Sequence, residues 1–325
     1  MGERSEKTDQ SKESSEKKPV ATRDAYGEVL LELGRERKNV VVLDADLSGS
    51  TKTGKFAKEF PDRFFNLGVS EQDLIGTAGG LSLTGKLPFA STFAVFETGR
   101  AWEQIRQTIC YSKLNVKLVA THSGITVGED GASHQAIEDV TLMRVLPNMT
   151  VIVPADAHET RQVIRTVADY VGPVYVRLGR AKVPIVMPED YQFQIGKAHT
   201  FHMGKDANIV AMGIMVGVAL ESAKILRDEG IDTGVINMST VKPLDTNTLL
   251  CASKACRLIV TAEEHSVIGA LGSAVSEFLS ENNPTRLLRI GMKDTFGCSG
   301  TSKELLKLYG LTADHMVKSI REALA

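Results

Sequence analysis

The chain has 325 residues, of which 42% are hydrophobic and 24% are charged, values typical of a soluble globular protein with about two domains. Its formal charge of -2 gives no field that would attract nucleic acid or an acidic membrane surface, and no apolar run is long enough to span a bilayer. No apolar segment follows the first methionine and the four cysteines match no zinc spacing, so we expect a cytoplasmic protein with reduced thiols and no membrane contact.

Residues 1–19 and residues 20–185 have different compositions. Residues 1–19 are mostly Ser, Glu, Lys and Asp, and they carry too little apolar surface to offset their ordering entropy, so we predict a disordered tail. From residue 20 to residue 185, short apolar runs alternate with segments of helical periodicity. The predicted strands are 39–43, 64–65, 87–92, 116–121, 150–153 and 173–178. The predicted helices are 24–38, 53–60, 70–83 with a capping box of Ser70 and Asp73, one striped by Trp102, Ile105 and Ile109, 138–145, and one capped by Asp156 and Glu159.

The alternation stops and then restarts in the second half of the chain. Residues 182–197 contain two prolines and mixed charge, and we place a linker at 186–197. A smaller domain over 198–325 follows, with strands at 207–212, 233–238, 257–262 and 286–290, and with helices at 216–227, 246–253, 269–279 and twice near the end. Near-continuous apolar strands that alternate with helices predict two consecutive α/β domains, each with a parallel sheet covered on both faces.

The most unusual local chemistry lies in residues 121–135, THSGITVGEDGASHQ, directly after a predicted strand. Loops at the carboxyl ends of parallel strands commonly form binding sites. His122, Asp130 and His134 could bind a metal, although their spacing on a glycine-rich loop is not a usual ligand spacing. The loop could also be solvated, with its glycines serving turns. We favour recognition of a hydroxylated or carbonyl substrate, because imidazole can donate, accept or transfer a proton near neutral pH.

Other polar and aromatic residues near strand ends each have an ordinary explanation when they are considered alone. A carboxylate in a first helical turn, such as Glu71, complements the helix dipole. Phe93 and Phe96 could pack in the core, and Arg23, Ser50 and Arg180 could be surface residues. The chain has no GxxxxGK[ST] segment and no GxGxxG segment after a strand, so no phosphate loop is indicated.

Taken together, however, these residues lie in segments that resemble the transketolase family in family order. The resemblance covers about residues 20–325 and is strongest up to Arg180. It is carried by ATRDAYGEVL from Ala21, VLDADLSGS from Val42, FFNLGVSEQDLIGTAGGL from Phe64, FASTFAVF from Phe89, THSGITVGEDGASHQAIEDV from Thr121, LPNMTVIVPAD from Leu146 and YVRLGRAKVP from Tyr175. It implies that 20–185 is the pyrimidine-binding domain for thiamine diphosphate and 198–325 is the family's C-terminal domain.

The resemblance also implies roles toward the cofactor. Glu71 matches the glutamate that hydrogen-bonds N1′ of the aminopyrimidine ring, Phe93 and Phe96 match aromatic residues around the ring, and Asp46 matches an acid near the cofactor and a subunit interface. A carboxylic acid that donates to N1′ favours the imino tautomer, whose nitrogen can take the proton from the thiazolium C2. Burial must keep the proton on this acid, because the helix N-terminus favours the anion.

Residues that face the substrate are implied in the same way. His122 and His134 match histidines that contact the reacting oxygens of the sugar, and with Glu71 they are the catalytic candidates. Asp130 matches an acid that reads a sugar hydroxyl. The substrate phosphate is expected to bind to Arg23, Ser50 and Arg180, since the planar fork of arginine pairs well with phosphate oxygens.

Two departures from the family pattern shape the functional expectation. Gly99 stands where many members have a third aromatic residue. The family's diphosphate domain, marked by GDG and a later asparagine, is missing, because GEDG at Gly128 lies inside the pyrimidine-domain loop. We therefore expect one half of a split transketolase. A partner subunit would carry the diphosphate and Mg²⁺ site, with two copies of each subunit in the assembly.

The expected reaction is transfer of a two-carbon ketol unit from a ketose phosphate to an aldose phosphate. The alternatives are a 1-deoxyxylulose-5-phosphate synthase-like subunit, a 2-oxoacid dehydrogenase beta-like subunit and a non-catalytic scaffold partner. The first lacks a histidine at the position of His122, and the second is not expected to carry the THSG…GEDG…H set. A scaffold would not need to retain Glu71, both histidines and the phosphate-binding candidates.

Overall fold

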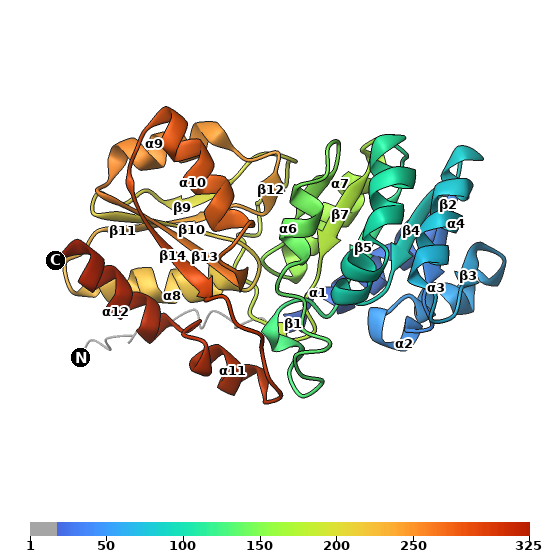
Figure 1. The fold of residues 1–325 in the computed structure, drawn as a ribbon, viewed down its shortest axis with the longest axis horizontal. Coiled ribbons are helices and arrows are strands. Elements are labelled where there is room, and N and C mark those ends of the chain that lie inside the picture. The colour runs from blue at the N-terminus through green and yellow to red at the C-terminus, as the bar shows by residue number, and fades with distance from the viewer. Residues whose placement is uncertain (1–17) are drawn as a thin grey trace, which may run out of the picture.

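The computed structural model describes residues 18–325, so the predicted disordered tail falls almost wholly outside the described residues. Two α/β units lie side by side along the long axis of the molecule, with the N-terminal unit on the right of Figure 1 and the C-terminal unit on the left. No helix within the described range is both long and apolar enough to cross a membrane.

The first unit contains a seven-stranded sheet whose strands are parallel except at one edge. Its edge strand β12 belongs to the second half of the chain and pairs antiparallel with β6. In spatial order the strands are β12 (Thr240–Lys242), β6 (Thr150–Ile152), β7 (Val174–Arg177), β5 (Lys117–Ala120), β4 (Leu87–Ser91), β2 (Val40–Asp44) and β3 (Phe64–Asn66).

The second unit contains a five-stranded sheet that is parallel apart from the edge strand β9, which runs antiparallel to β11. In spatial order the strands are β14 (Arg286–Met292), β13 (Leu258–Ser266), β10 (Ala207–Ala211), β11 (Thr233–Asn237) and β9 (His199–His202). The α/β prediction with two consecutive sheet domains is confirmed, whereas the expectation of wholly parallel sheets is wrong at these two edges.

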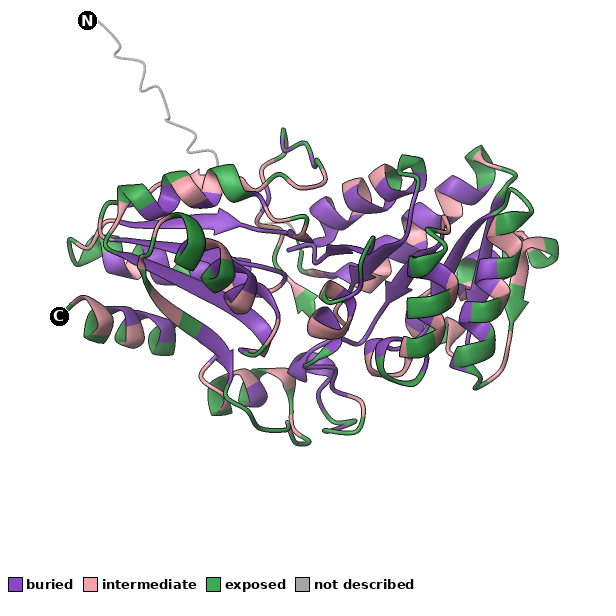
Figure 2. Ribbon diagram, turned by 45° about the horizontal axis from the view of Figure 1, so that its top comes forward, coloured by how far each residue is buried: buried purple, intermediate pink, exposed green. Residues whose placement is uncertain are grey.

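Helices cover both faces of both sheets, and two hydrophobic cores run through the molecule (Figure 2). Val40 and Val42 of β2 point into one core, and Val41 and Leu43 point into the other, as the two-residue period of a strand requires. The first core packs residues of α1 (Thr22–Glu36), α3 (Gly54–Glu59), α7 (Ala157–Asp169), α8 (Met215–Asp228), α11 (Ser302–Leu308) and α12 (Ala313–Leu324). The second packs residues of α4 (Glu71–Leu83), α6 (Asp139–Arg144), α9 (Thr246–Ala255) and α10 (Leu271–Asn282).

Some local predictions differ from the structure. The expected capping box of α4 does not form, because Ser70 makes no side-chain cap hydrogen bond. The helix striped by Trp102, Ile105 and Ile109 is largely of the wider π type, with π segments at Phe96–Arg100 and Ile105–Tyr111 around the short α5 (Trp102–Gln104). Four short strands were not predicted, because each lies at a sheet edge or in a two-stranded ribbon and has no long apolar run in the sequence. They are β9, β12, β1 (Val20–Ala21) and β8 (Lys182–Val183).

Asp156 joins α7 to the segment between the two units. Its Oδ1 accepts a hydrogen bond from the Glu159 backbone N–H at 2.9 Å, which confirms the predicted cap. Its Oδ2 accepts from the backbone N–H groups of Val186 and Met187 at 2.7 and 2.8 Å. One buried carboxylate therefore satisfies three backbone donors.

We expect Asp156→Ala to lower the free energy of unfolding by about 3 kcal/mol, because the helix cap is lost and two further N–H groups lose their acceptor. Urea unfolding followed by circular dichroism measures the change. Asp169→Ala is the matched control, since Asp169 is an exposed acid paired with Arg37, and its loss should change stability by less than about 1 kcal/mol. Equal effects of the two substitutions would contradict this role for Asp156.

Candidate functional site

The carboxyl ends of β4 and β5 are held together beyond the regular strands, and this pairing assembles the site. Phe93 and Thr121 form an isolated parallel bridge, in which the Thr121 N–H donates to Thr92 O at 3.0 Å and the Ala94 N–H donates to Thr121 O at 2.8 Å. The residues that follow each strand are therefore forced into contact. The rings of Phe93 and His122 stack with their centroids 3.8 Å apart.

Further predicted residues join this stack. The ring of Phe96 lies parallel to that of Phe93 at 6.1 Å, and His134 meets the edge of Phe96 at 5.3 Å. Arg23, at the start of α1, places Nη1 at 3.0 Å from Nε2 of His122. The structure thus brings together five predicted site residues that span more than 100 positions of the chain, and we call this group the aromatic–histidine cluster.

The hydrogen bonds of His122 define its tautomer. Arg23 can only donate, so Nε2 of His122 accepts, and Nδ1 carries the proton that it donates to Thr121 Oγ1 at 2.8 Å. Burial, and then the positive charges of Arg23 and Arg180, lower the pKa of His122 to about 3. The imidazole is therefore neutral near neutral pH, with a lone pair on Nε2 at the arginine side of the cluster.

The three predicted phosphate-binding residues lie around the same edge. The Thr22 side chain accepts a hydrogen bond from Gly179 N–H at 2.8 Å, which brings the start of α1 beside the loop that carries Arg180. Arg23 donates to the backbone oxygen of Ser50 at 3.1 Å, while its buried Nε has no partner. Burial lowers the pKa of Arg23, Asp24 opposes this effect, and the charge of Arg180 lowers the pKa further. Two cations with an unpaired donor make this edge suitable for an anion.

Asp130 and Asp46 lie outside the aromatic–histidine cluster. Asp130 is partly exposed and places Oδ2 at 3.4 Å from Arg180, which also donates to Val127 O at 2.6 Å. Asp46, just after β2, is exposed and accepts a hydrogen bond from Asn66 at 2.8 Å. Its backbone has a left-handed φ of 64°. Within residues 18–325, no group of three or more His, Cys, Asp or Glu side chains is placed to hold a metal ion, so His122, Asp130 and His134 do not form such a set.

Glu71 begins α4 and is only 2% exposed. Both of its carboxyl oxygens accept from Nη1 of Arg100, at 3.1 and 3.0 Å, and the Arg100 guanidinium lies 4.7 Å above the Phe96 ring. The neighbouring Gly99 leaves open space, since a Cβ there would meet nothing within 4 Å. Sequence reasoning missed Arg100, although an arginine four residues after Phe96 in a helical segment is a detectable sign of such a stack.

Glu97 is a second functional candidate that sequence reasoning missed. It lies in the π segment after Phe96, it is fully buried, and neither carboxyl oxygen has a hydrogen-bond partner. Burial raises its pKa well above the ordinary value, and the charges of Asp44 and Glu71 raise it further. Burial therefore favours the neutral acid form of Glu97, and the charge of Glu71 is one of those that favour it further. An isolated glutamate in the sequence carries no sign of such burial.

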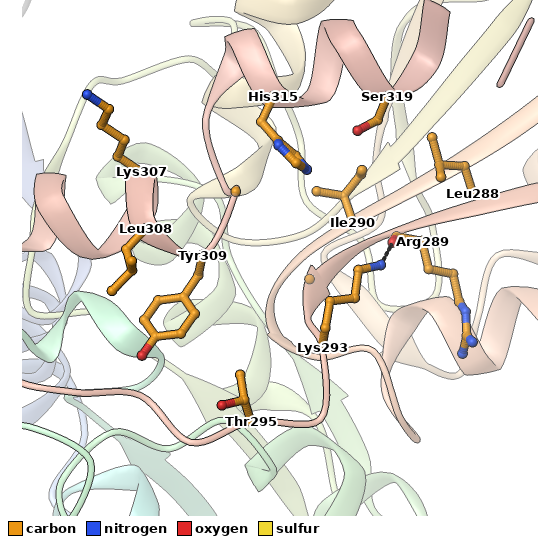
Figure 3. A pocket seen from close by; sticks show the side chains of 12 residues that line it. Leu288, Arg289, Ile290, Lys293, Thr295, Lys307, Leu308, Tyr309, His315 and Ser319 are labelled. Atoms are coloured by element: carbon orange, nitrogen blue, oxygen red, sulfur yellow. Dashed lines mark hydrogen bonds between the residues drawn. The ribbon is translucent and has the colours of Figure 1, made fainter. Parts of the chain in front are cut away.

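A separate cavity of about 450 Å³ lies in the second unit, between β14 and α12. Figure 3 shows His315 and Ser319 of α12 pointing toward Lys293, which follows β14. The lining residues include none of the ten predicted site residues, so this cavity is distinct from the aromatic–histidine cluster.

Comparison with known proteins identifies the family. Residues 18–186 match the model of the transketolase pyrimidine-binding domain, and residues 196–316 match that of the transketolase C-terminal domain. The chain belongs to the transketolase family. These two models are those that the sequence resemblance implied, and they match successive parts of one chain.

Among similar proteins, a putative transketolase C-terminal section from Methanocaldococcus jannaschii is 52% identical over 303 residues, which cover 92% of this chain and 95% of that protein. A 6-deoxy-6-sulfo-D-fructose transketolase subunit from a Clostridium species (strain MSTE9) is 40% identical over 300 residues, which cover 92% of this chain and 93% of that subunit. A solved structure described as a split gene transketolase, an inactive β4 tetramer, is 55% identical, with a TM-score of 0.86 over 94% of this chain and 98% of that one. The chain is thus similar over nearly its whole length to a C-terminal section and to a separate subunit.

The neutral state of His122 makes the stability of this transketolase chain depend on pH. At pH 5 the folded chain keeps His122 neutral, while the unfolded chain, with an ordinary histidine pKa of about 6.5, binds a proton there. The stabilisation is therefore fully present above about pH 6.5 and is lost as the pH falls toward 3. We expect the wild type to lose about 2 kcal/mol more than His122→Gln between pH 7 and pH 5, measured by urea unfolding. Identical pH dependence in the two proteins would contradict a buried neutral His122.

Proposed function

We propose that this chain is the subunit of a thiamine-diphosphate-dependent transketolase that holds the pyrimidine half of the cofactor and the reacting part of the sugar. It would transfer a two-carbon ketol unit from a ketose phosphate to an aldose phosphate. The observation that carries the proposal is the aromatic–histidine cluster, with buried Glu71 linked to Phe96 through Arg100 and with the charge of Arg180 acting on Arg23. The residues therefore offer a buried acid, an aromatic wall, a neutral base and an anion site at one sheet edge.

The residues around Glu71 fit an aminopyrimidine ring. The planar guanidinium of Arg100 already lies against Phe96 and donates to both oxygens of Glu71, which is the geometry that a flat nitrogen heterocycle would need. The open space at Gly99 leaves room for Arg100 to move aside. Thiamine diphosphate, when bound, would supply the nucleophilic carbon that accepts the two-carbon unit. Phe93 and Phe96 would exclude water from the ring, and Glu71 would hold a proton at N1′.

The chain's other residues would act on the sugar. The Nε2 lone pair of His122, which accepts from Arg23 in the free chain, would accept a hydrogen bond from a sugar hydroxyl once the substrate displaces that donor. His134 would contact the reacting oxygens beside it. Arg23 and Arg180, with the Ser50 loop, would bind the phosphate and fix the sugar's register.

A partner subunit would supply the diphosphate and Mg²⁺ site, with two copies of each subunit in the assembly. Two findings support this part of the proposal. The relatives that match this chain over nearly their whole length are named as a C-terminal section and as subunits, and the similar β4 tetramer is described as inactive. If the cofactor must be bound by residues of two different subunits, an assembly that contains only one of them would be inactive.

The sulfonated sugar in the name of the Clostridium relative makes a second substrate class worth testing. A sulfonate carries its charged oxygens on a tetrahedral centre, as a phosphate does, so the planar forks of Arg23 and Arg180 could bind either anion. A 1-deoxyxylulose-5-phosphate synthase-like activity is disfavoured by His122. A scaffold role is disfavoured because the catalytic candidates are retained within one contact group.

We expect ketol transfer from xylulose 5-phosphate to ribose 5-phosphate when this chain is combined with the partner subunit, thiamine diphosphate and Mg²⁺. Glu71→Gln should lower kcat by about 10²–10⁴, because a fixed proton donor or acceptor contributes on that order, and it should weaken cofactor binding measured by calorimetry. Glu59→Gln is the control, since Glu59 is a glutamate of a surface ion pair with Arg35. Activity of this chain without a partner would disprove the split-site proposal, and an unimpaired Glu71→Gln pair would disprove the site assignment.

We expect Arg180→Ala to raise KM for phosphorylated donors by about 10–100-fold, because a charge-assisted hydrogen bond contributes roughly 1.5–3 kcal/mol. KM for unphosphorylated xylulose should change little. Arg161→Ala provides the control, since Arg161 pairs with Glu28 on the surface. If Arg180→Ala weakens phosphorylated and unphosphorylated donors equally, Arg180 does not read the phosphate.

A further inference from the structure

Residues of the second unit form hydrogen bonds with the loop 121–135, which carries His122 and His134. At the middle of the loop, the Thr126 N–H donates to Oε1 of Glu264 at 2.6 Å, and Thr126 O accepts from Oγ of Ser302 at 2.9 Å. At its end, Nε2 of Gln135 donates to Cys298 O at 2.9 Å. These three hydrogen bonds come from β13, the start of α11 and the segment between β14 and α11. Residues of the second unit thus hold a segment whose functional side chains face the first unit.

Glycines make this close approach possible on both sides. Gly124 has a left-handed φ of 73°, and a Cβ there would collide with the carboxylate of Glu264. Gly131 has a φ of 75°, and its Cβ would lie 2.6 Å from Oγ of Ser299. A Cβ on Gly297 would collide with the side-chain oxygen of Gln135. The glycines of the loop therefore serve the contact between units as well as the turns.

Glu264 is the buried centre of the contact. Its side chain lies under the loop, and its backbone oxygen accepts from Nη2 of Arg177 at 3.0 Å. The same Nη2 donates to Ala136 O at 3.0 Å, and Nε of Arg177 donates to Asp139 at 2.8 Å. Arg177 is buried at the end of β7, so one arginine ties the loop's exit, α6 and β13 together.

The entry and exit of the loop are fixed from within the first unit. Ser123 donates through both N–H and Oγ to Leu178 O, and Gly124 N–H donates to Ala136 O at 2.8 Å. In the segment between them, the 3₁₀ turn Ile125–Val127, Val127 O accepts from Arg180 of the first unit, whereas both backbone groups of Thr126 bond to Glu264 and Ser302 of the second. Loss of the two bonds to the second unit would free Thr126 at the middle of the loop while the two ends stayed anchored.

We propose that Glu264 is a positioning residue: the second unit holds residues 121–135 in shape through the Glu264–Thr126 hydrogen bond, so that His122 and His134 stay against Phe93 and Phe96. The consequence for catalysis rests on the proposed function, whereas the consequence for the loop does not. The second unit then helps to position the residues that contact the sugar, and Glu264 affects the substrate only through the loop 121–135.

Hydrogen exchange on the complete chain tests the proposal without any assay of activity. We expect Glu264→Ala to speed amide exchange within residues 122–135 by about tenfold, since the hydrogen bond to Thr126 N–H is lost and its donor is left free. Exchange in β2 and β10 should be unchanged. Glu264→Gln should restore slow exchange, because the amide oxygen can still accept from Thr126 N–H.

Glu263→Ala is the matched control. Glu263 is the adjacent buried glutamate of β13, but it accepts from Leu271 N–H and Gly272 N–H at the start of α10. Its loss should speed exchange in α10 and leave residues 122–135 protected. This control separates a loop-specific effect from general loosening of the second unit.

If Glu264→Ala does not fold, Ser302→Ala provides the milder test, since it removes only the hydrogen bond to Thr126 O. Unchanged loop exchange in the folded variant, or faster exchange spread equally over the whole chain, overturns the proposal. With the partner subunit, Glu264→Ala should lower kcat by about 10–100-fold, as small misplacements of catalytic groups do, and Glu264→Gln should recover most of it. If the wild-type pair shows no ketol transfer, the proposed function fails while the exchange result still decides the role of Glu264.

Discussion

The short parallel bridge between Phe93 and Thr121 is the interaction on which the candidate site depends. The two neighbouring strands pair beyond their regular ends, two residues past β4 and one residue past β5, and this pairing brings the rings of Phe93 and His122 into a stack. Phe96, His134 and Arg23 then contact this stack. Without the bridge, the loops after β4 and β5 would be free to diverge, and the residues would share an edge of the sheet but no contact.

The charges of the site are arranged by depth. Glu97 and His122 lie in the interior, where burial raises the pKa of Glu97 and lowers that of His122, and so disfavours the charged form of each. Arg23 and Arg180 are partly exposed. Glu71 is as buried as His122 and is paired with Arg100. The groups whose charged forms are disfavoured are thus separated from the arginines that attract an anion. A neutral His122 also avoids the charge repulsion that a protonated imidazole would have with Arg23 and Arg180.

Much of the fold could be predicted because strong local patterns encode it. The apolar runs of β2, β4, β5 and β7 and the periodicity of α7 gave correct elements, since strands covered on both faces must be apolar throughout. The strands β9 and β12 could not be found, because a short edge strand needs a partner that lies far away in sequence. The π-type turns after Phe96 have no pattern that distinguishes them from an ordinary helix.

The candidate site could be predicted only in part from the sequence. The position of His122 after a strand was readable, but its stack on Phe93 depends on register between strands. The roles of Glu71 and of the arginines came from resemblance to a family, and those roles stay predictions. Arg100 and Glu97 were missed because the importance of each comes from what surrounds it: a stacked ring and a carboxylate for Arg100, and the lack of any partner for Glu97.

The edge strand β12 has a consequence for how the molecule can be divided. It leaves the second unit, completes the sheet of the first by pairing with β6, and returns, so the two units share one hydrogen-bonded ladder. Cutting the chain between the units would leave β6 as an open edge that invites pairing with other molecules. The first sheet is therefore complete only when both units are present in one chain.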